Sequence, residues 1–331
     1  MHSSIQFIEY YLPEKVLTNK DLEELFPEWN ATKISEKIGI NQRHISSSEQ
    51  TSVDLAYEAA NKVFSKFEKS KIDFLLLCTQ SPDYYLPASA CVLQSKLGLR
   101  TNIGALDFNQ GCSGYIYGLS LAKGLISSNI AQNVLLITSE TYSKFIYSKD
   151  KSNRSIFGDG AAATIISGSN EQKIFNFDLG TNGDGMNNLI VPNGGLRVPF
   201  DCNPIEISDS SSTRTNNHLY MNGPEIFNFT IDNVPITVDS CLKKNNILID
   251  EIDFVIFHQA NKYMLNHLRK KMRIPENKFY INLENTGNTV SSTIPIALKD
   301  AINKNLVKKG DKILLVGFGV GYSWGSTIIQ L

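Results

Sequence analysis

The chain has 331 residues, a formal net charge of −1 and 20% charged residues. A balance this close to neutral gives no electrostatic signal for a nucleic-acid or membrane-surface partner. Its hydrophobic content of 42% is typical of a globular protein with a substantial core, in one large domain or two ordinary ones.

No targeting or membrane-spanning segment is recognisable in the chain. No basic region followed by an apolar stretch opens it, and no apolar run approaches the roughly 20 residues of a spanning helix. The five cysteines are odd in number, widely spaced and outside any CxxC pair. This pattern argues against a disulfide scaffold or a zinc site. We therefore expect a cytoplasmic protein that holds no metal ion.

Apolar runs alternate with helical patterns along the chain. The runs that predict buried strands cover 72–78, 102–108, 133–139, 252–257 and 312–318. The helical patterns cover 52–68, 87–97, 113–127, 224–243, 261–272 and 291–303. Pro235 should kink or end the helix at 224–243, and residues 324–331 resemble a returning strand. The alternation predicts an α/β fold with largely parallel central strands.

A faint internal repeat divides the chain into two halves. "IDFLLLCTQ" at 72–80 resembles "IDFVIFHQA" at 252–260, and "NVLLITS" at 133–139 is echoed by "KILLVGF" at 312–318. "ALDFNQGCSG" at 105–114 aligns with "INLENTGNTV" at 281–290. The common order predicts a duplication with halves at 1–175 and 176–331. It places Cys112 and Asn288 on equivalent turns.

Residues 181–220 interrupt this pattern. They are rich in Gly, Asn, Pro and Ser and too long for a simple connector, which favours a lid or pocket wall. A surface excursion without a role explains the same composition.

Cys112 stands between glycines where a predicted strand gives way to a helix. Free N–H groups and the helix dipole at such a position favour the thiolate, so we expect the pKa of Cys112 to lie below its usual ~8.5. Gly111 and Gly114 permit a tight turn and close approach of a substrate. A catalytic nucleophile and a small buried cysteine are both consistent with this stretch.

Two more residues could take part in chemistry. His258 ends the strand at 252–257, and open α/β sheets place their sites at such ends, although a structural histidine is the commoner case. Asn288 lies in the loop before the helix at 291–303, where a capping role is the simpler reading. The glycines of "GFGVGYSWGSTII" at 317–329 could present backbone N–H groups to a reacting carbonyl.

Together these motifs resemble the 3-oxoacyl-acyl-carrier-protein synthase III (ketoacyl synthase III) family of the thiolase-like superfamily. The resemblance rests on the order Cys, His, Asn in "GCSG" (111–114), "HQAN" (258–261) and "GNT" (287–289), and on "GFGVGYSWGS" (317–326). "YLPEKVLTN" (11–19), "FGDGAA" (157–162) and "MNGPEIF" (221–227) extend it over nearly the whole chain. It implies a five-layered α-β-α-β-α fold of two similar halves, and a homodimer.

The resemblance also implies a mechanism without a cofactor, in which the substrates are thioesters of coenzyme A and acyl carrier protein. Cys112 would hold the acyl group, while the N–H groups of Cys112 and Val320 form an oxyanion hole. His258 and Asn288 would stabilise the enolate that forms when malonyl-acyl carrier protein loses CO2. Phe318 would face the malonyl carboxylate.

Further positions are expected to bind substrate or partner by the same resemblance. The tunnel for coenzyme A and the carrier arm would be lined by Trp29, Lys37, Lys151, Gly223 and Asn261. Leu86 stands where the family has a bulky aromatic that reaches the partner's acyl pocket, and Val320 replaces a glycine. These departures suggest a primer other than an acetyl group. The basic helix at 266–273 would dock acyl carrier protein through Arg269, Lys270, Lys271 and Arg273, unless this run is only a solvated face.

Decarboxylative condensation is the leading hypothesis. On the same fold, an acyltransferase could move the acyl group to an oxygen or nitrogen acceptor in glycan or secondary metabolism. A non-catalytic dimer partner would lack the nucleophile, and a cysteine hydrolase would not need Asn288. The sequence leaves the primer and the pathway open.

Overall fold

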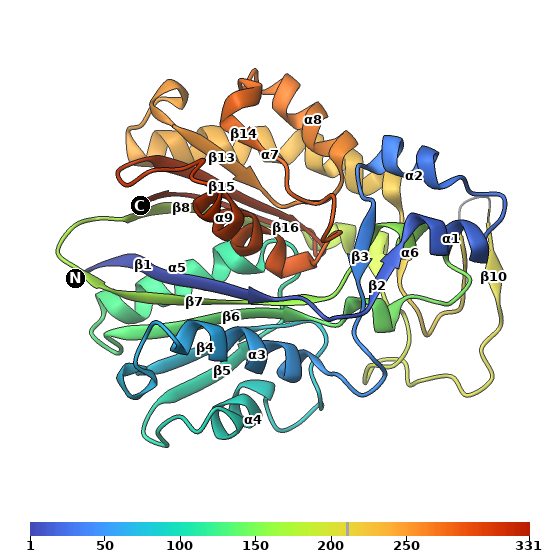
Figure 1. Cartoon of the computed structure of the whole chain (residues 1–331), viewed down its shortest axis with the longest axis horizontal. Helices are drawn as coiled ribbons and strands as arrows, with labels where there is room; N and C mark the ends of the chain where they lie inside the picture. Colours follow the sequence, from blue (N-terminus) through green and yellow to red (C-terminus); the bar gives the residue numbers. More distant parts are fainter. Residues whose placement is uncertain (210–211) are drawn as a thin grey trace.

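Each apolar run that predicts a strand forms one in the two five-stranded sheets of the computed structural model, which describes residues 1–209 and 212–331 (Figure 1). The first sheet has the order β1 (His2–Tyr11), β7 (Gly160–Ser169), β6 (Asn133–Glu140), β4 (Phe74–Cys78) and β5 (Gly104–Phe108). The second has the order β8 (Ile174–Thr181), β16 (Ser323–Gln330), β15 (Lys312–Gly319), β13 (Phe254–Phe257) and β14 (Phe279–Tyr280).

The two sheets repeat one topology. β4 pairs in parallel with β5 and β6, and β13 pairs in parallel with β14 and β15. In each sheet the next two strands are antiparallel. The sequence segments that resemble each other therefore hold corresponding places, since β4 matches β13 and β6 matches β15. The returning strand expected at 324–331 is β16.

Helices fill the space between the sheets and cover both outer faces (Figure 1). The central layer consists of α5 (Gly114–Ser127) and α9 (Thr293–Asn303), whose apolar side chains join one core with strands of both sheets. The first sheet is covered outside by α3 (Ser52–Phe64) and α4 (Ser89–Lys96), and the second by α7 (Gly223–Asn245) and α8 (Lys262–Lys271). Five layers alternate as α-β-α-β-α.

The shorter elements gather mainly at one end of the sheets (Figure 1). They include β2 (Val16–Thr18), β3 (Gln42–His44), α1 (Asn19–Leu25), α2 (Ala31–Ile38) and α6 (Lys151–Ile156). The segment 181–220 contributes β9 (Leu189–Ile190), β10 (Ile207–Ser208), β11 (Thr213–Arg214) and β12 (Tyr220–Met221). The 3-10 turns are η1 (Lys69–Lys71), η2 (Tyr142–Phe145), η3 (Gly183–Asn188), η4 (Ile249–Glu251), η5 (Glu276–Lys278) and η6 (Val290–Ser292).

Pro235 was expected to kink or end its helix, and the second of these alternatives is wrong because α7 continues through it. Proline lacks the N–H that would bond the carbonyl four residues earlier, which here belongs to Ile231. The side-chain Nζ of Lys271 on α8 donates to that carbonyl at 2.8 Å. Because a neighbouring helix satisfies the freed group, α7 continues to Asn245.

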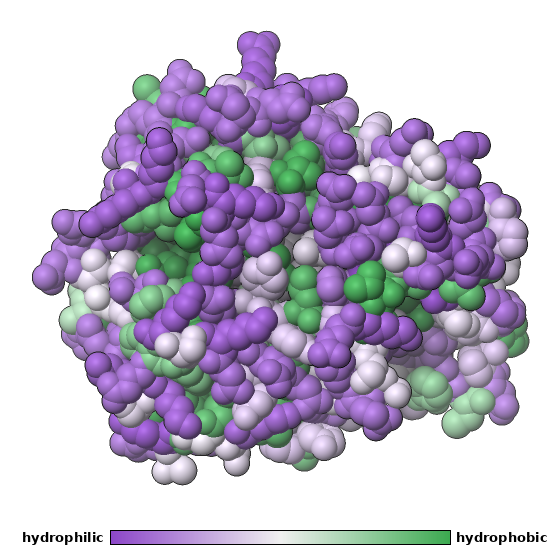
Figure 2. All heavy atoms as spheres, viewed as in Figure 1, coloured by the Kyte–Doolittle hydropathy of each residue, from purple (hydrophilic) through white to green (hydrophobic). Residues whose placement is uncertain are grey.

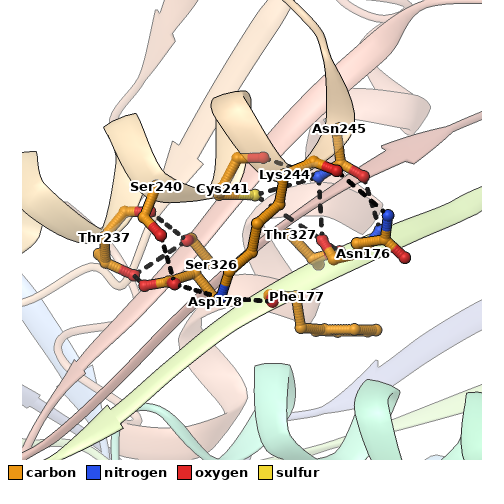
Figure 3. A network of polar contacts seen from close by, with 10 residues as sticks. All are labelled: Asn176, Phe177, Asp178, Thr237, Ser240, Cys241, Lys244, Asn245, Ser326 and Thr327. Carbon is orange, nitrogen blue, oxygen red and sulfur yellow. Dashed lines mark hydrogen bonds and ion pairs between the residues drawn. The ribbon is translucent and has the colours of Figure 1, made fainter.

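A polar network fixes α7 to the second sheet (Figure 3). Asp178 on β8 accepts hydrogen bonds from Thr237 at 2.7 Å and from Ser240 and Lys244 at 2.6 Å. These donors hold the pKa of Asp178 below its ordinary value, although burial acts in the opposite direction. The carboxylate therefore joins strand and helix in its charged form.

Polar side chains cover most of the face seen in Figure 2, where apolar groups form separate patches. Within residues 1–209 and 212–331, none of the helices combines the length and the apolar character that crossing a membrane requires.

Candidate active site

Cys112 lies where the two halves of the fold meet. It follows β5 and precedes α5, and its side chain contacts the backbone of β15 from the other sheet. A Cβ atom at Gly319 would stand 2.8 Å from the Cys112 sulfur, and one at Gly317 would stand 2.9 Å from the Cys112 carbonyl oxygen. Both distances are too short for any side chain, so glycine at these two positions allows the close contact.

The expected low pKa of Cys112 was wrong. Burial and the nearby Glu140 carboxylate raise the pKa of the Cys112 thiol to about 12. Hydrogen bonds from the backbone N–H groups of Cys112 and Val320 oppose this rise without overcoming it. The sulfur is therefore a thiol at neutral pH, and two N–H groups point toward it.

Glu140 is a buried carboxyl group at the end of β6. Its oxygens accept from the backbone N–H of Gln80 and from the hydroxyl groups of Ser81 and Ser291 at 3.0–3.2 Å. Burial raises the pKa of Glu140 to about 8, although these hydrogen bonds lower it. The group is mostly protonated at neutral pH and bridges loops of both halves.

His258 follows the end of β13, where its backbone N–H donates to the carbonyl of Val316 at 2.7 Å. Its ring nitrogen Nδ1 lies 2.7 Å from the Thr293 hydroxyl oxygen. The ring of Phe318 stands nearly perpendicular to the imidazole, with centroids 5.6 Å apart. Burial lowers the pKa of His258 to about 3, against an opposing hydrogen bond with the Val290 backbone. The imidazole is therefore neutral.

Asn288 is held by its backbone and by one end of its amide. Its N–H donates to the Ile156 carbonyl at 2.9 Å, and its carbonyl accepts from Gly158 at 3.0 Å. The side-chain Oδ1 accepts from the Val290 N–H at 2.9 Å. Among the described residues, the amide nitrogen Nδ2 has no hydrogen-bond partner. The side chain is thereby oriented as a donor.

Val290 connects these groups. Its N–H fixes Asn288, its backbone also interacts with His258, and its side chain belongs to the same buried cluster as Cys112. The other buried members of this cluster are Tyr142, Phe157, Leu189 and Leu219, and Val320 packs against it. The ends of the 181–220 segment therefore form part of the wall around Cys112.

The residues expected in the tunnel do not form one contacting group. The Nζ of Lys151 stands 5.9 Å from the centroid of the Trp29 ring and forms an ion pair with Glu28 at 2.9 Å. Asn261 caps α8 by accepting from the Met264 N–H at 2.9 Å. Lys37 on α2 and Gly223 at the start of α7 are exposed. No contact unites all five positions in the described structure.

The expected partner-binding residues also differ from one another. Leu86 is 83% exposed beside Tyr84 and Tyr85, which are exposed as well. Lys270 on α8 is exposed, and so is Arg273, which lies beyond the helix because α8 ends at Lys271 and not at the expected residue 273. Arg269, in contrast, forms an ion pair with Glu276 at 3.5 Å, and Lys271 donates to the Ile231 carbonyl.

No sequence pattern singled out Glu140, Val290 or Thr293 as functional residues. The one available signal for Glu140 was its position, as a polar residue directly after the apolar run 133–139. Within the described residues, no group of three or more His, Cys, Asp or Glu side chains could hold a metal ion.

Comparison with known proteins gives consistent matches along the chain. The 3-oxoacyl-[acyl-carrier-protein (ACP)] synthase III family matches residues 106–183, and the C-terminal family of the same synthase matches residues 242–331. Beta-ketoacyl-[acyl-carrier-protein] synthase III of Fusobacterium nucleatum is 37% identical over 98% of both chains. The enzyme of the same name from Clostridium perfringens (strain ATCC 13124) is 39% identical over 97% of both.

Solved structures agree with these matches. A crystal structure of a 3-oxoacyl-(acyl-carrier-protein) synthase III is 46% identical, with a TM-score of 0.98 over 100% of both chains. A 3-oxoacyl-(acyl-carrier protein) synthase from Burkholderia xenovorans is 34% identical, with a TM-score of 0.92 over 100% of this chain and 94% of that one. The predicted five-layered thiolase-like fold is confirmed.

Proposed function

The chain belongs to the 3-oxoacyl-[acyl-carrier-protein] synthase III family, and on that premise we propose that it condenses an acyl primer with malonyl-acyl carrier protein. The product is a 3-oxoacyl-acyl carrier protein, and the intermediate is an acyl group on Cys112. The observation that carries this proposal is the arrangement of hydrogen-bond donors around Cys112. Its sulfur faces two backbone N–H groups. The turn at Val290, which lies beside it, contacts both Asn288 and His258.

In the first half-reaction, the Cys112 sulfur attacks the thioester carbonyl of the primer. The N–H groups of Cys112 and Val320 stabilise the oxyanion of the tetrahedral intermediate. The leaving thiolate departs and takes up the proton that Cys112 loses, because the buried thiol enters the reaction protonated. The acyl group remains bound to the sulfur.

In the second half-reaction, the malonyl C–C bond breaks and CO2 leaves. The electron pair of that bond moves into the thioester, where His258 and Asn288 donate hydrogen bonds to the enolate oxygen. The enolate carbon then attacks the acyl-cysteine carbonyl, and the Cys112 thiolate leaves and takes up a proton from the solvent to restore the thiol. A neutral amide suits this role because it donates without exchanging a proton. Phe318 provides an apolar wall at the carboxylate.

The test is the intact mass of the protein after incubation with acyl-CoA and acyl-acyl carrier protein donors, for the wild type and Cys112→Ala. Malonyl-acyl carrier protein is then added to any acylated form. A Cys112-dependent adduct that discharges with CO2 and a 3-oxoacyl product supports the proposal. An adduct that ignores malonyl-acyl carrier protein points instead to acyl transfer to another acceptor, and no adduct at all contradicts the nucleophile assignment.

The primer is proposed to differ from an acetyl group. The Val320 side chain packs against the cluster around Cys112, and its Cγ1 occupies the space beside Gly111. The side chain of Leu86 is smaller than the aromatic side chain that the family has at this position, which would leave more room in the acyl pocket. A series of donors of increasing chain length in the mass experiment measures the preference, and fastest loading from acetyl-CoA would contradict this part of the proposal.

A homodimer is proposed from exposed features of the first sheet. β5 is an edge strand with unpaired backbone groups on one side, and such edges are normally covered or paired. Leu106 on β5 is 39% exposed, and the exposed residues Tyr84, Tyr85 and Leu86 lie in the same half of the fold. Sedimentation equilibrium measures the assembly state.

Acyl carrier protein is proposed to dock on the basic end of α8 and the turn that follows it. Only Lys270 and Arg273 carry this proposal, since Arg269 and Lys271 make the contacts within the chain described above. Charge reversal at Lys270 or Arg273 should weaken the interaction with an acidic carrier protein in a salt-dependent manner.

A further inference from the structure

The contacts around the His258 imidazole bear on which of its nitrogens carries the hydrogen. Nδ1 lies 2.7 Å from the Thr293 Oγ1, and the same hydroxyl lies 3.1 Å from the carbonyl oxygen of Val290. All three groups are buried. The ring also has a hydrogen bond with the Val290 backbone, which raises the pKa of His258 against burial. Beyond Thr293 and Val290, the residues that the structure describes offer the imidazole no hydrogen-bond partner.

A threonine hydroxyl has one hydrogen, so it can donate to only one of these two neighbours. If it donates to the Val290 carbonyl, its oxygen accepts from Nδ1–H, and Nε2 of the neutral ring carries a lone pair. If it donates to Nδ1, the hydrogen of the ring is on Nε2. The orientation of one hydroxyl therefore decides whether His258 presents an acceptor or a donor.

We propose that Thr293 is a positioning residue whose hydroxyl donates to Nδ1 and holds His258 in the tautomer with hydrogen on Nε2. The inference rests on the proposed condensation, in which an oxygen becomes negatively charged. Asn288 is already constrained as a donor because its Oδ1 is bound to the Val290 N–H. Two donors then meet the enolate oxygen, whereas the other tautomer would place a lone pair against it.

Thr293→Val tests this idea because it keeps the shape of the side chain and removes the hydroxyl. The polar neighbour left for Nδ1 is then the Val290 carbonyl, which can only accept and so favours hydrogen on Nδ1. We expect decarboxylation of malonyl-acyl carrier protein to fall by about 10²–10³-fold, the cost of losing one oxyanion donor. Loading of the primer onto Cys112 should change little. Thr293→Ser should restore decarboxylation.

Thr289→Val is a matched control. Thr289 lies on the same turn, is equally buried, and its hydroxyl oxygen has no hydrogen-bond partner in the described residues. The same loss of a hydroxyl at this position should leave both half-reactions unchanged. Equal defects in Thr289→Val and Thr293→Val would show a general disturbance of the turn and overturn the proposal.

The closing experiment is 15N NMR of the imidazoles in histidine-labelled protein, with the His258 signals assigned by difference from His258→Gln. It reports the tautomer directly and does not require activity. Hydrogen on Nε2 in the wild type and on Nδ1 in Thr293→Val supports the inference. Hydrogen on Nδ1 in the wild type overturns it, even if Thr293→Val does not fold. If the wild type forms no 3-oxoacyl product, the proposed function fails, while the tautomer measurement still decides the role of Thr293.

Discussion

The amide oxygen of Asn288 accepts a hydrogen bond of 2.9 Å from the backbone N–H of Val290, a residue with a φ angle of +55°. A β-branched residue rarely adopts this left-handed conformation, which costs about 1–3 kcal/mol. The surrounding contacts therefore maintain a strained turn. Its consequence is that the amide oxygen of Asn288 faces Val290, while the amide N–H groups, which have no partner among the described residues, are left for a substrate.

Asn288→Asp should separate this donor function from the structural role of the side chain. A carboxylate can still accept from the Val290 N–H, but it has no hydrogen to donate and it repels a developing enolate. We expect decarboxylation to fall by about 10²–10³-fold or more, with little change in acyl loading of Cys112. Release of CO2 from malonyl-acyl carrier protein and intact mass measure the two steps. Equal loss in both steps would indicate a disturbed fold instead.

Glu140→Gln should make Cys112 more reactive in alkaline solution. The pKa of Glu140 is about 8, so above that pH its negative charge raises the pKa of the neighbouring thiol, and a neutral amide removes this effect. Alkylation of Cys112 by iodoacetamide should be similar in both proteins near pH 7, and roughly threefold or more faster in the variant near pH 9.

Peptide mass analysis must follow Cys112 separately, because Cys91 and Cys202 are exposed and will also react. They provide an internal control, since their rates should not depend on Glu140. A wild-type rate at Cys112 that already levels off near neutral pH would contradict the raised pKa of about 12.

The position of Cys112 could be predicted from sequence, but its electrostatics could not. The end of an apolar run, the flanking glycines and the following helical pattern are all local signals. The pKa depends instead on burial beneath β15 and on Glu140, which approach from other parts of the chain. A local sequence pattern predicts the effect of the helix dipole on the pKa of Cys112. It cannot predict the larger effect of desolvation by distant parts of the chain.

Long-range contacts also explain the other differences between expectation and structure. The repeat placed Asn288 opposite Cys112, yet the hydroxyl that contacts His258 comes from Thr293, which resembles an ordinary residue at a helix start. Pro235 is a helix breaker by its own chemistry, and only the approach of Lys271 from α8 allows the helix to continue.

Asp178→Ala should destabilise the protein by about 1–3 kcal/mol, because three donors on α7 lose a charged acceptor. The pKa of Asp178 is lower in the folded state, so its contribution is present above its unfolded pKa and is lost as the pH falls through the folded value. The deficit of the variant in urea denaturation should therefore shrink in strongly acidic solution. Asp239→Ala, at an exposed position on the same helix, should change stability by less than about 0.5 kcal/mol.

Lys271→Met should lower the free energy of unfolding by about 1–2 kcal/mol, because it leaves the Ile231 carbonyl without the donor that Pro235 cannot supply. In a Pro235→Ala background, the restored backbone N–H can bond that carbonyl, so the same substitution should cost much less. A double-mutant cycle in urea measures the difference. Equal costs in both backgrounds would show that Lys271 does not compensate for the proline. Lys270→Met is the matched control, and it should leave the free energy of unfolding unchanged. If α8 docks acyl carrier protein, this variant should still weaken the binding of that partner.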